Sequence, residues 1–419
     1  MNTSSIVTSG TQTYGGNIAL GTNTTLTAGL FNFTNVTTSG AYALTLAPYG
    51  TSFNSTQSLS GLTLASATTG FTVGSLSNNA TITLPNAVAI NGPITVYGGA
   101  INVNANLSDT QNTTNNGIQL LASGVFTDTN NLSTTKGNIT IKGAQIAISN
   151  GVTFTPGTSG NWNIWSTNTS PWSGSTPDSD GTLTYNYKQY NASYGTTTPL
   201  GTGNGLLYSY APTLTFNLTG SVTKTYDGTT SATLTSANYN VTGNVAGDTV
   251  NYTSPTTGTY NTKDAGTSKT VSVSGMNITS VTSSTGKSVY GYQVASSNVS
   301  GTVGVINKAT LTVAANNQSM TYGGTLPTLT ETVTGYVNGE TSSVIGGTPT
   351  ATTSASSTTN AGTATITSSV SGLTATNYNF VTGSNAILTI NKANLTVTGT
   401  SSPSKTYDGL NTSTITGGS

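Results

Sequence analysis

Two stretches of sequence decide the fold of the first part of the chain: GPITVYGGAINV at residues 92–103 and GNITIKGAQIAI at residues 137–148. In each stretch apolar and polar residues alternate in two short runs, and a period of two is typical of β-strands. The second copy follows without a gap at an offset of 137 − 92 = 45 residues. A related motif, GIQL at residues 117–120, lies between them, which indicates two coils of about 22 residues each.

Coils of this length are typical of a solenoid, in which each coil buries its apolar residues only by stacking on its neighbours. We therefore predict a right-handed parallel β-helix over residues 1–155, with an ordinary β-sandwich as the alternative. The composition favours an all-β fold, because Thr is a strand former while Asn, Ser and Gly favour turns, and helix formers are scarce.

A second set of repeats occupies the rest of the chain. The sequence KTYDG at residues 224–228 returns at residues 405–409, an offset of 405 − 224 = 181, and a degenerate copy, TYGG, stands at residues 321–324. The sequence INKA at residues 306–309 returns at residues 390–393, an offset of 390 − 306 = 84. Because the markers recur in the same order, they predict tandem modules.

The markers also set the expected boundaries. We predict an aromatic-rich cap or linker at residues 156–212, β modules at 213–309 and 310–393, and the start of a further module at 394–419. Each module is expected to be a small β-rich fold, either a sandwich or β-grasp-like, joined directly to the next. Residues 394–419 are too few to bury a core alone, so we expect that the chain is part of a longer one or that these strands pair with a neighbour.

Composition and charge exclude several classes of function. The 419 residues include ten basic and ten acidic side chains, a formal net charge of zero, and no Cys, His or Arg. This excludes imidazole or thiolate metal sites and Ser-His-Asp or Cys-His catalysis. No basic cluster suits nucleic acid, and no apolar run approaches the roughly 18 residues of a membrane span. We therefore expect no enzyme activity, cofactor, metal, nucleic-acid partner or membrane insertion. The alternative of a glycosidase with two paired carboxylates stays open, because the spacing of acidic residues in the sequence does not give their distance in space.

The aromatic residues of the cap segment are the first candidate site. Trp162, Trp165 and Trp172 are the three Trp residues of the chain, and all lie within residues 156–212. We expect them mainly to cover the last coil of the β-helix, which would otherwise expose its core. The alternative is a glycan-binding surface, because the apolar faces of sugars stack on aromatic rings.

The repeated turns supply the other candidates. We interpret as structural anchors the residues Tyr226, Asp227, Gly228, Tyr322, Gly323, Tyr407, Asp408 and Gly409. Since Gly323 stands where the other copies carry Asp, the position is more typical of a turn than of a reaction centre. Asp178 and Asp180 resemble a fragment of a calcium loop but lack its remaining acidic ligands. Glu331 and Glu340 enter only as a possible buried acid for a Lys–Asn isopeptide bond, which their polar surroundings disfavour.

Together, the GNITI coils, NWNIWS at residues 161–166 and the YDG and YGG units resemble large filamentous-haemagglutinin-type bacterial surface adhesins. The stalks of such proteins carry β-rich repeats called YDG and MBG modules. The resemblance covers about residues 90–419. The family's amino-terminal secretion domain, with its Asn-Pro-Asn-Gly signature, is absent from this sequence, so export by that route is expected only of a parent chain.

The resemblance implies a non-catalytic stalk or adhesion segment that is extracellular, at the bacterial cell surface. Its implied partners are a host or environmental glycan or protein, or neighbouring copies of itself. A self-assembling fibre or surface-layer subunit is the alternative, and a β-helix enzyme acting on polysaccharide is less favoured.

Overall fold

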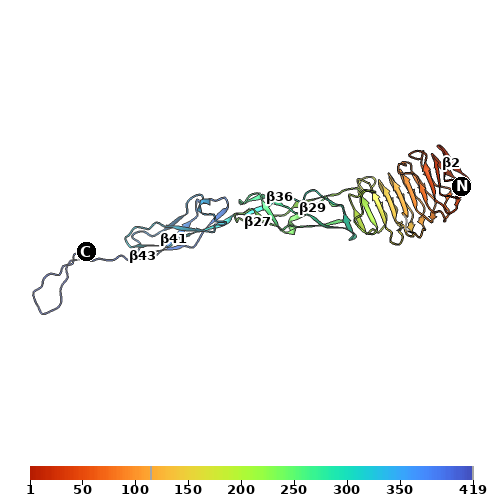
Figure 1. The fold of residues 1–419 in the computed structure, drawn as a ribbon. Helices are drawn as coiled ribbons and strands as arrows, with labels where there is room; N and C mark the ends of the chain where they lie inside the picture. The colour runs from red at the N-terminus through yellow and green to blue at the C-terminus, as the bar shows by residue number, and fades with distance from the viewer. Residues whose placement is uncertain (114–115, 418–419) are drawn as a thin grey trace. The chain divides into compact units, whose positions relative to one another are not determined.

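The structure, a computed structural model, describes residues 1–113 and 116–417 and confirms the all-β fold class (Figure 1). Among these residues the only helical elements are the short 3-10 turns η1 (Ser236–Asn238) and η2 (Ser342–Val344). No helix in this part of the chain has the length and apolar character needed to cross a bilayer.

The chain divides into two compact units that are interleaved in sequence. Unit 1 comprises Met1–Asn217, Tyr239–Ser254 and Gly275–Val299, and unit 2 comprises Leu218–Asn238, Pro255–Ser274 and Ser300–Ser419. The strands of residues 213–309, expected to form one module, are therefore shared between the two units.

Unit 1 begins with a parallel β-helix, coloured red to yellow in Figure 1. One face is a parallel sheet of successive coils: β4 (Thr24–Ala28), β7 (Leu44–Pro48), β10 (Phe71–Val73), β13 (Ile94–Gly98), β16 (Ile118–Ala122), β19 (Ile139–Gly143) and β22 (Trp162–Ser166). A second face comprises β8 (Gln57–Ser58), β11 (Ile82–Leu84), β14 (Ile101–Val103), β17 (Val125–Asp128), β20 (Gln145–Ile148) and β23 (Ser179–Asp180). A third comprises β12 (Val88–Ile90), β15 (Leu107–Asp109), β18 (Leu132–Thr134) and β21 (Phe154–Thr155).

Register explains the repeat in the sequence. Ile94 pairs with Ile118, Ile118 pairs with Ile139, and Ile139 pairs with Trp162, so the 45-residue offset spans two coils. All four side chains are buried inside the coil stack. Each buried aliphatic side chain contributes about 1.5–3 kcal/mol, and here that gain exists only because a neighbouring coil supplies the covering surface.

The first face continues beyond the last regular coil. β22 is followed in the same sheet by β25 (Gly205–Tyr208), β24 (Tyr187–Gln189), β34 (Ser288–Tyr290), β33 (Ile278–Ser283) and β30 (Asp248–Tyr252). A smaller sheet of β29 (Tyr239–Thr242), β26 (Thr213–Leu218) and β35 (Gln293–Val294) accompanies them. The sheet of the β-helix is thus continued past its last regular coil by strands that prolong the same ladder.

Unit 2 contains two sets of strands. The first is the sheet β27 (Val222–Thr225), β36 (Val299–Asn307), β32 (Gly266–Val273), β31 (Thr257–Tyr260) and β28 (Ser231–Thr233). The second comprises the sheet β39 (Glu331–Thr334), β37 (Ala309–Ala315) and β42 (Tyr378–Thr382), and the sheet β38 (Gln318–Thr321), β43 (Ala386–Asn391), β41 (Gly362–Ser369) and β40 (Thr350–Thr353). Lys308 alone separates β36 from β37.

Residues 394–417 form no strand, and one isolated bridge joins Ser401 to Thr416. Apolar side chains of this segment are exposed, with Leu395 at 92% and Tyr407 at 94%. Residues 418–419 of the segment predicted to start a further module lie outside the described residues.

Candidate functional site

The KTYDG motif at residues 224–228 comprises the end of β27 and the turn that follows it. The Tyr226 N–H donates to the Asn307 carbonyl at 2.8 Å, which fixes the tyrosine beside the end of β36. Asp227 Oδ1 accepts the Thr229 N–H at 2.9 Å and the Lys224 ammonium at 2.7 Å. Burial opposes ionisation of Asp227, but these hydrogen bonds outweigh it and lower its pKa. The Asp227 carboxylate therefore stabilises the turn through hydrogen bonds to residues close to it in the sequence.

The later copy of the motif folds in the same way. Asp408 Oδ1 accepts the Leu410 N–H at 3.0 Å and the Lys405 ammonium at 2.9 Å. Gly228, Gly323 and Gly409 all have positive φ, at 78°, 83° and 75°. The motif thus encodes its turn locally, because glycine adopts this backbone region without strain.

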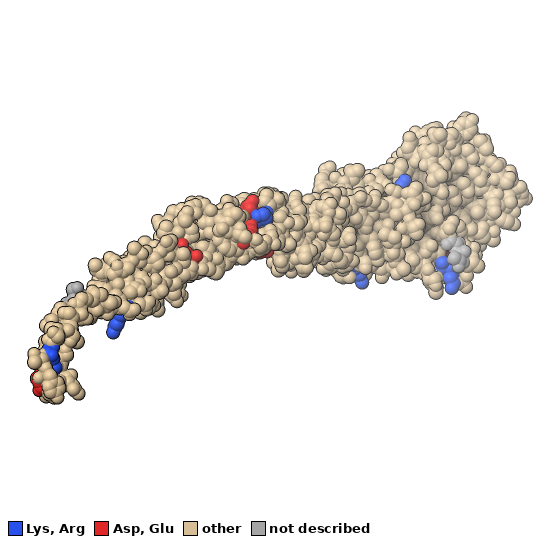
Figure 2. All heavy atoms as spheres, turned by 60° about the vertical axis from the view of Figure 1, so that its left-hand side comes forward, with Lys and Arg blue, Asp and Glu red and all other residues tan. Residues whose placement is uncertain are grey.

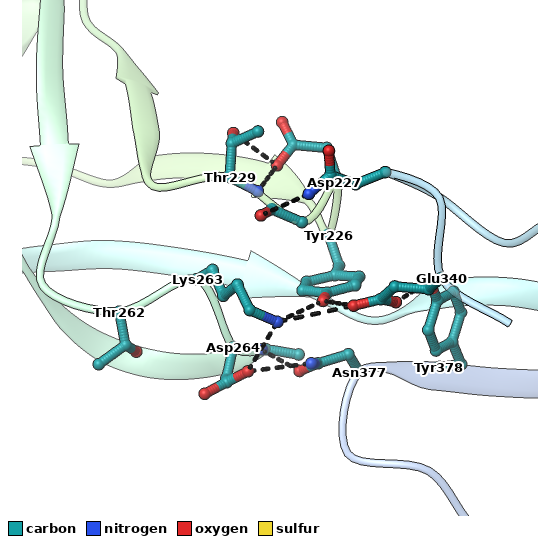
Figure 3. Close-up of polar contacts among 12 residues, drawn as sticks. Tyr226, Asp227, Thr229, Thr262, Lys263, Asp264, Glu340, Asn377 and Tyr378 are labelled. Carbon is teal, nitrogen blue, oxygen red and sulfur yellow. Dashed lines mark hydrogen bonds and ion pairs between the residues drawn. The ribbon is translucent and has the colours of Figure 1, made fainter. Parts of the chain in front are cut away.

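A network of polar contacts joins this turn to the second set of strands in unit 2, and we call it the Tyr226 joint (Figure 3). It comprises Tyr226, Lys263, Glu340 and Tyr378. The Tyr226 hydroxyl donates to Glu340 Oε1 at 2.6 Å, and the Tyr378 hydroxyl donates to Glu340 Oε2. Lys263 Nζ donates to the Tyr226 hydroxyl at 2.9 Å and lies 3.6 Å from Glu340 Oε1. The two rings meet edge to face, with centroids 5.5 Å apart.

The charges in the joint match these contacts. Hydrogen bonds from Tyr226 and Tyr378, with help from Lys263, lower the pKa of Glu340. Burial and the hydrogen bond to Glu340 raise the pKa of Tyr378 to about 12, and the same two causes raise the pKa of Tyr226. Near neutral pH the carboxylate is therefore ionised and both phenols keep the protons that they donate.

Two flanking contacts complete the connection. Asn377 donates to Asp264 Oδ1 at 3.0 Å and accepts the Ala265 N–H at 2.8 Å. On the other flank, Asn338 Nδ2 donates to the Gly228 carbonyl at 3.3 Å. These polar groups satisfy one another's hydrogen bonds, which is the chemistry of a structural interface.

The three repeat tyrosines do not share one environment. The Tyr322 N–H donates to the Asn391 carbonyl at 2.9 Å, as that of Tyr226 does to Asn307. Yet Tyr322 is 44% exposed and Tyr407 is 94% exposed, whereas Tyr226 is 2% exposed. The turn places the ring, but residues of the second strand set, Glu340 and Tyr378, bury it.

The three tryptophans are likewise separated. Trp162 and Trp165 are buried, and Trp162 packs edge to face on Phe154. Trp172 is 39% exposed and its ring packs on Tyr190, Tyr208 and Tyr210. Of the three rings proposed for glycan contact, Trp172 is the one that a ligand could reach.

Trp172, Asp178 and Asp180 line one cavity of about 220 Å³ in unit 1, which we call the Trp172 cavity. Asp178 accepts hydrogen bonds from the Ile146 N–H, the Ser166 hydroxyl and the Asn168 amide. Nowhere in residues 1–113 and 116–417 do three carboxylates gather to hold a metal ion. Asp178 and Asp180 alone therefore supply fewer oxygen atoms than the roughly six to eight ligands that calcium takes.

Sequence reasoning considered Glu340 only as a disfavoured acid for an isopeptide bond, and it assigned no role to Lys263 or Tyr378. A signal for the first two was available, because charged residues make up only 5% of the chain. Figure 2 shows how few and scattered the charged atoms are on one face of the molecule. In such a background a rare acid or Lys residue indicates a specific contact.

Comparisons with known proteins agree with the repeat markers. Searches of the curated proteins and of the solved structures gave no significant match. Residues 211–299 match the YDG domain family, and residues 311–389 match the family described as MBG domain (YGX type). The chain therefore carries a YDG domain and a YGX-type MBG domain within residues 211–389.

Proposed function

We propose that this chain is a non-catalytic stalk segment of a secreted bacterial surface adhesin. In this role it mediates attachment, or holds an adhesive part at a distance from the cell surface. The Tyr226 joint is the observation that carries the proposal. A stalk must transmit orientation from one module to the next, and here one connecting residue, Lys308, lies beside a hydrogen-bonded joint. The YDG and MBG domains support the same function.

The energetics favour a stiff connection. A hydrogen bond to a charged group contributes about 1.5–3 kcal/mol, and Glu340 accepts one from each of two tyrosines. The flanking contacts of Asn377 and Asn338 lie away from that carboxylate, so rotation about the connection breaks at least one set. In unit 1, the strands β24, β34, β33 and β30 belong to the same sheet as the first face of the β-helix. The β-helix is therefore joined to the strands that follow it by backbone hydrogen bonds and not by a flexible linker.

The location can be tested on the bacterium that encodes the chain. Antibodies raised against the chain should label intact cells, and external protease should remove the label. Deletion of the coding segment should reduce attachment of the cells to surfaces. Labelling that requires permeabilised cells would contradict the proposal.

The joint can be tested by distance measurement, since the chain has no Cys and accepts site-specific spin labels. Thr259→Cys and Thr350→Cys place labels at exposed positions in β31 and β40, on either side of the joint. We expect a narrow distance distribution that broadens in Glu340→Gln. Equal widths in both proteins would remove the joint as the source of stiffness.

Self-assembly is the second candidate function, and residues 394–417 favour it. This segment exposes five large apolar side chains: Leu395, Val397, Tyr407, Leu410 and Ile415. Burial of so many apolar side chains against a partner surface would lower the free energy of the assembly. Sedimentation of the full chain should then show a mass that rises with concentration, and Leu395→Ser with Val397→Ser should weaken it. A constant monomer mass would exclude this candidate.

A further inference from the structure

The Trp172 cavity has walls of two kinds. Ile146, Ile164 and Leu206, from the end of the β-helix, supply apolar surface. The chain leaves the β-helix after β22 and returns at β23, and this excursion carries Trp172 to its place over Tyr208. The partly exposed indole thus lies beside a preformed hollow whose other walls are fixed by the sheet.

One buried polar side chain lines the cavity without a partner. Tyr208 is 6% exposed, and its hydroxyl makes no hydrogen bond to any residue that the structure describes. Tyr208 lines the same cavity as Asp180 and Asp178, and burial and then these two carboxylates raise the pKa of Tyr208. A hydroxyl that no protein group binds is free to exchange a hydrogen bond with a ligand hydroxyl.

The charges of the cavity favour a neutral ligand. The Asp180 carboxylate accepts no hydrogen bond from another described residue, while the Asp178 carboxylate already accepts three. Lys188 also lines the cavity, and its ammonium is 3.6 Å from Asp248 and over the Tyr185 ring. Carboxylates disfavour an anion and the ammonium disfavours a cation, whereas a polyol offers both the donors and the acceptors that these groups need.

We propose that the Trp172 cavity binds one ring of a neutral saccharide, a hexopyranose unit, with its apolar face on Trp172 and its hydroxyls on Asp180 and Tyr208. A cavity of about 220 Å³ is smaller than the roughly 300–1,000 Å³ of drug-sized ligand sites, which suits a single ring. Sugar binding at this cavity is a function separate from the proposed stalk role. It is tested by sugar binding, whereas the stalk role is tested by cell labelling and by label distances.

The test uses the full chain with methyl glucopyranoside, methyl galactopyranoside and methyl mannopyranoside at millimolar concentration. Saturation-transfer NMR should show contact to the ring protons of at least one of them, and titration should shift the tryptophan fluorescence. Asp180→Asn should weaken binding by roughly tenfold, because a neutral amide oxygen replaces the charged acceptor. Trp172→Ala should abolish it.

Tyr208→Phe is the decisive variant, because the removed hydroxyl has no protein partner. It should retain the melting temperature of the parent chain but bind the sugar several-fold more weakly. Tyr322→Ala, which removes an exposed ring in unit 2, should bind normally. The inference is overturned if none of the three glycosides gives saturation transfer, or if Asp180→Asn and Tyr208→Phe bind as the parent does.

Discussion

The Tyr226 hydroxyl donates a hydrogen bond of 2.6 Å to Glu340 Oε1, although 114 positions separate the two residues in the sequence. Tyr378 donates to the other oxygen of the same carboxylate, so one acid connects two rings of the joint. The first two predictions below concern the joint, and the third concerns its flanking contact between Asn338 and Gly228.

Removing the Tyr226 ring should destabilise unit 2. Tyr226→Ala is expected to cost roughly 2–4 kcal/mol, because it leaves a cavity under Tyr378 and an acceptor on Glu340 without its donor. Tyr226→Phe, which keeps the ring, should cost roughly 1–2 kcal/mol. Thermal and denaturant unfolding measure both. Tyr322→Ala is the matched control, and an equal loss there would mean that burial by the second strand set is unimportant.

Acid should weaken the joint. The folded-state pKa of Glu340 lies below its ordinary value, so its stabilising contribution is complete above that ordinary value, about 4.3, and is lost as pH falls through the folded-state pKa. The distance distribution between labels at positions 259 and 350 should therefore broaden below about pH 4. Glu340→Gln should be broad at every pH, and a width in the parent chain that stays constant as acid is added until the chain unfolds would contradict this prediction.

A side chain at position 228 should collide with the second strand set. A Cβ built on Gly228 would lie 2.5 Å from Asn338 Cβ, whereas one built on Gly323 meets nothing within 4 Å. Both glycines have positive φ, so Gly228→Ala and Gly323→Ala share the backbone cost of about 1 kcal/mol. We expect Gly228→Ala to lower the melting temperature further, and Asn338→Gly to rescue that extra loss. Identical melting temperatures for the two Ala variants would refute the close approach.

Asp128, in the β-helix, should make unit 1 less stable as pH rises. Its side chain is buried, its Oδ2 has no hydrogen-bond partner among the described residues, and burial raises its pKa to about 7. Because the folded-state pKa is raised, the associated stability is complete below about pH 4 and is lost as pH rises through 7. Asp128→Asn should therefore be more stable than the parent at pH 8, by up to roughly 4 kcal/mol.

The pH dependence of unfolding provides the control for Asp128. Between pH 4 and 8 the loss of stability in the parent chain should disappear in Asp128→Asn but persist in Asp408→Asn, because the Asp408 carboxylate lies in an exposed turn. Parallel pH profiles for all three proteins would show that Asp128 does not titrate in this range.

The features that sequence could predict are those encoded locally or by repetition. The pairing of Ile94 with Ile118 and of Ile118 with Ile139 follows from a period of two within coils of similar length, and the KTYDG turn closes within a few residues. The Glu340 contacts could not be predicted, because nothing near residue 340 marks it as the partner of residue 226. The sharing of residues 213–309 between two units was equally hidden, since β34 continues a ladder that began in distant coils.

The different exposure of Tyr226 and Tyr322 has a consequence for mechanical unfolding. Tyr226 belongs to the first strand set of unit 2 but is buried by residues of the second set. The free energy of this contact therefore stabilises both sets only while they are packed together. A pull that unravels β42, which carries Tyr378, and the loop that carries Glu340 also uncovers Tyr226 and makes the turn after β27 easier to unfold. Extension of unit 2 is therefore expected to proceed in a preferred order, with the loss of the later strands preparing the failure of the earlier ones.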